Sequence, residues 1–232
     1  MKEAGPAMAG GKSIFGKVAA VFAGLSGVAA PAQAGAPNSE SEHPAAITAE
    51  QELRSLRLVV REAGTAARRN QILSERGATS DDSVFAAPLA EGLEMIVVAD
   101  RGSTNSMWMV RDLTRYHLTA EAVQALARQQ VLAVLPTLPP KEAVAGGAVR
   151  IPQTDYLASL MLADGWDALD RALGGQLIVA VPSDNVIIVA DGAAADVRAM
   201  LPGFVEAQYA DASRSVSPRL YRRENGAWVT VN

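Results

Sequence analysis

Three aspartates, Asp100, Asp164 and Asp184, are residues whose type and setting could carry acid–base chemistry. Asp100 ends an apolar run before a Gly-containing turn, and Asp184 lies at the tip of an expected hairpin. Asp164, Asp167 and Asp170 recur every three residues, which places three carboxylates on roughly one face of a helix. Paired carboxylates can act as general acid and base or hold a hard cation. The calcium-loop spacing is missing, so we favour a solvated acidic face, and turn-forming roles for Asp100 and Asp184.

His117 is the histidine with a possible catalytic setting, since it directly precedes an expected helix that begins after Thr119. It could serve as a general base there, although the positive end of a helix disfavours the imidazolium. The other histidine, His43, lies in a small polar segment and is expected to be solvated. The chain has no cysteine, which excludes thiol nucleophiles and cysteine-ligated metals. We expect no cofactor and no metal site.

Arginines and aromatic residues gather near the C-terminus. On a strand, Arg219, Tyr221 and Arg223 share one face, and Trp228 follows on the next expected strand. This cluster, which Arg214 precedes, could bind an acidic partner. The formal net charge of -4 gives no overall drive toward nucleic acid, so we expect no nucleic-acid partner. The structural alternative, an edge strand protected by arginines against aggregation, is the favoured interpretation.

The N-terminal segment has the pattern of a secretory signal peptide. Lysines precede an uncharged apolar run over residues 18–30, and Ala32-Gln33-Ala34 follows in an A-x-A arrangement. The run is too short for a stable membrane span. We therefore predict a signal peptide over residues 1–34, with cleavage after Ala34 and Met1 or Met8 as the start. A disordered spacer over residues 35–47 then precedes a single domain over residues 48–232.

Local patterns predict an α+β fold in which antiparallel hairpins pack against three or more helices. At 49% hydrophobic and 20% charged, the 232-residue chain can bury a core of its own. The expected helices are about 49–62, 65–76, 119–135, 155–172 and one that is capped by Asp191 and ends at Leu201 before Pro202. A strand at Leu56–Val60 is the alternative within the first of them. Ile72 and Leu73 are expected to face inward, and Val134 belongs to the apolar stripe of the helix over 119–135. The expected strands are 91–100, 107–110, 176–181, 186–190, 219–223 and 227–231, the last two joined at Asn225-Gly226.

Several segments, taken in order, resemble the YtpQ-like family of bacterial proteins, a domain of unknown function. They are PLAEGLEMIVVAD (88–100), WMVRDLTRYHLTAEAVQALARQQVLAVLP (108–136), DYLASLMLADGWDAL (155–169), QLIVAVPSDNVIIVADG (176–192) and SPRLYRRENGAW (217–228). The resemblance covers about residues 85–230 and implies one α+β domain. It implies no activity and no site residue.

The function expected from these observations is an exported, non-catalytic binding or interaction module in the periplasm or outside the cell. Its partner would be an envelope protein, and no stable membrane span would remain after cleavage. One alternative is a hydrolase that uses the carboxylates of Asp100, Asp164 and Asp184. A second alternative is a cytosolic protein that keeps its N-terminus.

Overall fold

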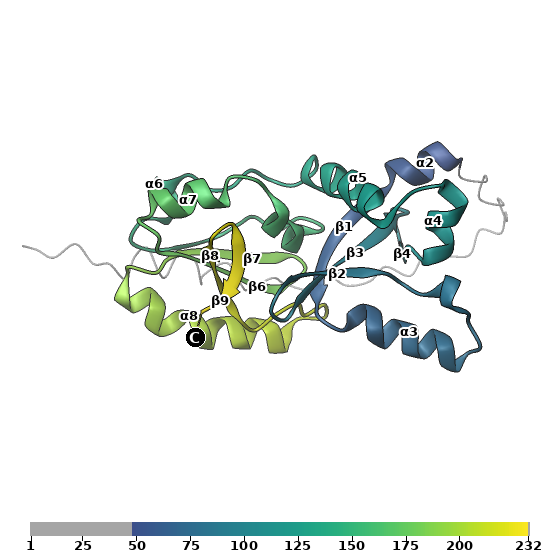
Figure 1. Cartoon of the computed structure of the whole chain (residues 1–232). Coiled ribbons are helices and arrows are strands. Elements are labelled where there is room, and N and C mark those ends of the chain that lie inside the picture. Colours follow the sequence, from purple (N-terminus) through teal and green to yellow (C-terminus); the bar gives the residue numbers. More distant parts are fainter. Residues whose placement is uncertain (1–47, 232) are drawn as a thin grey trace, which may run out of the picture. The chain divides into compact units, whose positions relative to one another are not determined.

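The computed structural model describes residues 48–231, and these contain two antiparallel sheets (Figure 1). The strands of the first sheet are β1 (Leu56–Glu62), β2 (Ala86–Ala90), β3 (Leu93–Asp100) and β4 (Asn105–Met107). They follow the order β1-β3-β2, and β4 pairs with the end of β3 that lies beyond β2. Leu56, Leu58 and Val60 face the main core, whereas Val59 faces a smaller core, because side chains alternate along a strand.

The second sheet has the order β5-β7-β6-β8-β9. Its strands are β5 (Ala148–Arg150), β6 (Leu177–Ser183), β7 (Val186–Asp191), β8 (Leu220–Glu224) and β9 (Ala227–Thr230). Every residue of β6 and β7 is buried, since both faces of these strands are covered. The β8–β9 turn places Asn225 and Gly226 at positive φ, as an Asn-Gly hairpin requires.

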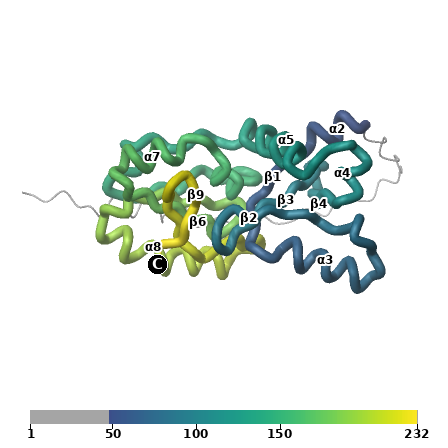
Figure 2. The backbone as a smooth tube through the Cα atoms, viewed as in Figure 1, coloured from purple at the N-terminus to yellow at the C-terminus, as the bar shows by residue number. Residues whose placement is uncertain are grey.

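Helices cover the sheets. The described helices are α2 (Ala49–Arg54), α3 (Thr65–Glu75), α4 (Val110–Tyr116), α5 (Ala120–Leu132), α6 (Lys141–Val144), α7 (Trp166–Ala172) and α8 (Ala195–Asp211), with short 3₁₀ turns η2 (Ser80–Asp82) and η3 (Leu157–Leu162). Val197, Leu201 and Val205 of α8 pack on one face of the second sheet, and Figure 2 shows α8 running beside β6. The opposite face of that sheet shares the main core with α5, η3, α7 and the first sheet. All described residues belong to one compact unit of the chain.

The predicted α+β class is confirmed, and both predicted hairpins form. Thr119 caps α5 as expected, because its side chain accepts a hydrogen bond from the Ala122 amide. The helix predicted over 49–62 is wrong beyond Arg54, where the alternative strand forms instead. The reason is the alternation of Leu56, Leu58 and Val60, which pairing with β3 converts into a buried strand face.

Further details of the prediction are also wrong. The helix expected over 155–172 is interrupted between η3 and α7, and the strand expected at 107–110 gives way to α4 from Val110 onward. Asp191 does not cap α8; its carboxylate instead accepts hydrogen bonds from the Gly146 and Ala193 amides. The helix α8 continues through Pro202 to Asp211 because its apolar face is held by the sheet beneath it. Ile72 and Val134, expected to face inward, are exposed, Val134 because α5 ends at Leu132.

The signal peptide predicted over residues 1–34, its cleavage after Ala34, the spacer over 35–47 and His43 all lie outside the described residues. Within the described range, no helix combines the length and apolar character needed to cross a membrane.

Candidate functional site

The described part of the chain contains a polar cleft of about 900 Å³, which is the candidate site. Five segments that are distant in sequence line it. They are Arg61 on β1, Gly102–Asn105 in the β3–β4 turn and at the start of β4, Gln153–Tyr156 before η3, Asp184–Asn185 at the β6–β7 turn, and Ser213–Arg214 after α8. We call this the Tyr156 cleft, after the aromatic residue in its wall. Both sheets contribute to it, so the whole fold positions its walls.

One end of the Tyr156 cleft is built around the carboxylate of Asp184. Its Oδ2 atom lies 3.1 Å from Nη1 of Arg214 and 3.7 Å from Nη1 of Arg61. The side chains of Asp184 and Arg61 are 11% and 19% exposed, whereas that of Arg214 is 67% exposed. Burial lowers the pKa of the Arg61 guanidinium, Asp184 opposes this effect, and Arg214 adds to it. Two cations therefore share one carboxylate at this end.

The backbone around Asp184 fixes the three segments that meet there. The Asp184 amide donates to the Arg214 carbonyl at 3.1 Å, and the Ala158 amide donates to the Asp184 carbonyl at 3.0 Å. The Val216 amide donates to the Pro182 carbonyl at 2.9 Å, which joins the same two segments again. The cleft wall is therefore held by main-chain hydrogen bonds rather than by side chains alone.

Tyr156 stands between the Asp184 end and the turn that follows β3. Its φ of 61° lies in the left-handed region, which is unusual for a residue other than glycine. Its hydroxyl donates to Oδ1 of Asn105 at 2.9 Å. Burial raises the pKa of the Tyr156 hydroxyl, and the nearby Asp100 carboxylate raises it further. The hydroxyl therefore stays protonated at neutral pH and acts as a hydrogen-bond donor.

Of the predicted site candidates, Asp184 lines this cleft, whereas Asp100 does not line it but lies near the Tyr156 hydroxyl. Oδ1 of Asp100 accepts from the Gly102 amide at 2.9 Å, which is the turn role expected for it. The carboxylate of Asp184 makes its ion pairs across the fold, so the turn role that was favoured for it is wrong. Oδ2 of Asp100 also lies 4.0 Å from Nη2 of Arg57.

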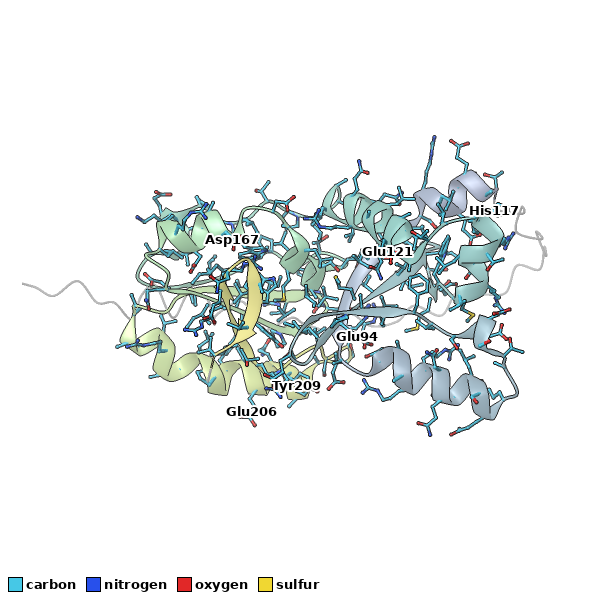
Figure 3. All side chains as sticks on the ribbon, in the orientation of Figure 1. Glu94, His117, Glu121, Asp167, Glu206 and Tyr209 are labelled. Carbon is cyan, nitrogen blue, oxygen red and sulfur yellow. The ribbon has the colours of Figure 1, made fainter. Side chains whose placement is uncertain are left out.

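His117 and Asp164 lie elsewhere. His117 is an exposed residue that ends α4, and Figure 3 labels it far from Asp167 of α7. The side chain of Asp164 is 92% exposed and pairs with Arg128. Asp167 pairs with Arg223 and Asp170 accepts from the Leu177 amide, so the three spaced aspartates have three separate partners. Among the described residues, no three acidic or histidine side chains are arranged to hold a metal ion.

The C-terminal basic and aromatic residues have internal partners. Tyr221 is fully buried, and its hydroxyl bonds to Ser217 and to the Glu91 carbonyl. Trp228 is also buried and donates to the Met161 carbonyl, while Arg223 lies over its ring and pairs with Asp167. Arg219 pairs with Glu91 at 2.7 Å. The favoured interpretation of an arginine-protected edge is wrong, because β8 lies between β6 and β9 and is not an edge strand.

Sequence reasoning missed Arg61, Tyr156 and Asn105 as site residues. The one sequence signal for Arg61 is the apolar strand run that it follows, which places it near the end of a strand. Tyr156 lies in the turn before η3 and Asn105 begins the short strand β4, so their meeting depends on tertiary structure.

The walls of the Tyr156 cleft present mostly polar and charged side chains. Its lining offers guanidinium, amide, hydroxyl and carboxylate groups, and the side chains of Ser103, Gln153, Thr154, Asp155 and Ser213 make no hydrogen bond to another described residue. Among the described residues that line it, no serine hydroxyl is bonded to a base, which is the arrangement a nucleophile requires.

Comparisons of the chain with protein-family models, with curated proteins and with solved structures find no match. The fold and the cleft therefore define the protein as an antiparallel α+β protein with a polar cleft between segments of both sheets.

Proposed function

We propose that this protein is an exported binding protein whose Tyr156 cleft takes up a small polar ligand. The observation that carries the proposal is the cleft itself, a polar hollow whose walls are fixed by the main-chain bonds around Asp184. Fixed walls reduce the entropy that a ligand loses on binding. Export is supported by the leader pattern of residues 1–34, with cleavage after Ala34.

The proposal is tested by a thermal unfolding screen of the purified full chain. The library contains small organic acids, their primary amides, inorganic phosphate and sugars. A ligand at about one hundred times its Kd stabilises the folded state by about 2.7 kcal/mol, which raises Tm measurably. We expect at least one such compound.

Two matched variants locate the binding. Tyr156→Phe removes the hydroxyl that donates to Asn105 in the cleft, and Tyr209→Phe removes a hydroxyl that donates to Glu62 outside it. The increase in Tm should shrink in Tyr156→Phe and persist in Tyr209→Phe. A screen without any stabilising compound, or equal effects of the two variants, would overturn the proposal.

The hydrolase alternative has one supporting observation, since Asp155 and Asp184 both line the cleft. It requires turnover of a bound compound, which product analysis by mass spectrometry would detect.

Intact mass of the protein from its native host tests export and should show a chain that begins at Gly35. A chain that retains the residues before Gly35 would support the cytosolic alternative.

A further inference from the structure

The Asp184 end of the Tyr156 cleft has an uneven charge count. Two guanidiniums, those of Arg61 and Arg214, lie within 4.0 Å of the Asp184 carboxylate. Within the described range, no other carboxylate forms an ion pair with either arginine. The three groups together carry one net positive charge.

The donors of these arginines are largely unused. Both contacts to Asp184 involve Nη1 atoms and the single oxygen Oδ2. Nε and Nη2 of both arginines make no hydrogen bond to a described residue, whereas Nη1 of Arg61 also reaches the Val60 carbonyl at 3.4 Å. A guanidinium presents its donors as a planar fork that suits carboxylate and phosphate oxygens.

Burial makes a second anion favourable here. The Arg61 side chain is only 19% exposed, and its contact with Asp184 is the longer of the two, so its charge is incompletely compensated. An unpaired buried charge is costly, and an incoming anion would lower that cost. The largely exposed Arg214 gives such an anion a route from solvent.

We propose that the Tyr156 cleft recognises its ligand through one compact oxyanion, a carboxylate or a phosphate group, held between Arg61 and Arg214. This inference rests on the proposed binding function and names its ligand class. Asn185 and Ser213 line the same end and supply further polar groups to the oxyanion. The carboxylates of Asp155 and Asp184 also line the cleft and repel ligands with many negative charges, so polyanions are excluded.

The test compares Arg214→Gln with Arg222→Gln in the full chain. Arg222 is a matched control because it is exposed and pairs with a neighbouring carboxylate, Glu224, on β8. Thermal unfolding first verifies that both variants are folded. Ligand-observed NMR then measures binding of succinate, succinamide and inorganic phosphate, together with any ligand found in the library screen.

We expect succinate or phosphate to bind the wild type, and the one that saturates at lower concentration identifies the preferred oxyanion. Loss of the Arg214 guanidinium should weaken this binding about tenfold or more, since a charge-assisted hydrogen bond is lost. Arg222→Gln should bind the oxyanion as tightly as the wild type does. Succinamide should bind neither the wild type nor either variant. If ligands bind but amides bind as tightly as acids, or Arg214→Gln has no effect, the oxyanion inference falls and the binding function stands. If no library member binds, both fall.

Discussion

Asp184 occupies a hairpin turn, yet its carboxylate contacts arginines from β1 and from the segment after α8. Asp100 also occupies a turn, and its carboxylate accepts a hydrogen bond from an amide two residues away. The two residues look alike in sequence because aspartate is common in turns for local reasons. Only the partners that the fold supplies distinguish a turn residue from a site residue.

Replacing Asp184 by asparagine should lower the free energy of unfolding by about 3 kcal/mol. The change keeps the shape of the side chain but leaves the largely buried Arg61 guanidinium without a counter-charge. Urea denaturation at neutral pH measures the effect.

Asp164→Asn is the matched control, because Asp164 is exposed and pairs with Arg128 at the surface. Its free energy of unfolding should equal that of the wild type within error, since exposed ion pairs contribute little to stability. Equal free energies of unfolding for the two variants would show that Asp184 does not stabilise the charge of Arg61 in the folded state.

At the level of residues, the sequence pointed to Asp100 and Asp184 but not to Arg61 or Tyr156. Aspartates at strand ends stand out from their neighbours, whereas one arginine among the arginines of this chain does not. The ion pair of Arg61 with Asp184 joins β1 of the first sheet to a turn of the second. Local spacing contains no information about such a contact.

Among the elements, the hairpins were predictable and the helix ends were less so. Branched apolar runs around Pro182-Ser183-Asp184-Asn185, and Asn225-Gly226, define their hairpins locally. Pro202 suggested a helix end, but α8 continues because Val197, Leu201 and Val205 pack on the sheet. Packing over the length of an element can outweigh the local preference of one residue.

Two glycines near α8 should respond oppositely to alanine. A Cβ on Gly192 would lie 2.8 Å from the Gln176 carbonyl oxygen and 2.9 Å from Cδ1 of Ile178, so the β7–α8 connection would have to shift. Gly203 lies within α8, and a Cβ there meets nothing within 4 Å.

We expect Gly192→Ala to lower the free energy of unfolding by about 2 kcal/mol. Gly203→Ala should raise it by about 0.5–1 kcal/mol, because alanine restricts the unfolded chain and favours the helix. Denaturant titration of both variants provides the measurement. Stabilisation by Gly192→Ala would mean that β7 and α8 are connected less tightly than the structure shows.

At the scale of the whole molecule, all four tyrosines of the chain have a raised pKa. Burial is the largest cause for Tyr116, Tyr156 and Tyr221, and the hydrogen bond with Glu62 is the largest for Tyr209. The folded state therefore keeps these protons at pH values where the unfolded chain releases them.

Stability should consequently fall as the pH rises above about 10, the value at which an unfolded tyrosine titrates. Below that pH both states are protonated, so these four groups leave the stability unchanged. Chemical denaturation between about pH 8 and pH 11 tests this expectation. Tyr221→Phe should make the free energy of unfolding fall less steeply with pH, because Tyr221 is fully buried. A free energy of unfolding that stays constant over this range would contradict the expectation.

The class and the antiparallel arrangement of the fold were predictable from hydrophobic patterning. The meeting of five distant segments in the Tyr156 cleft was not, because it depends on how the two sheets share their core. The resemblance to the YtpQ-like family over residues 85–230 stays a prediction, as do the leader and an envelope partner.

The most direct test of the central claim, that the Tyr156 cleft is the binding site, is a backbone-amide NMR titration of the isotope-labelled full chain with the compounds of the library. We predict saturable shifts concentrated at Thr104, Asn105, Tyr156, Asn185 and Arg214, which line the cleft. Saturable shifts concentrated elsewhere, for instance at Leu135 and Leu138 in the apolar groove beside α7, would contradict the account. A spectrum that no compound changes would contradict it as well.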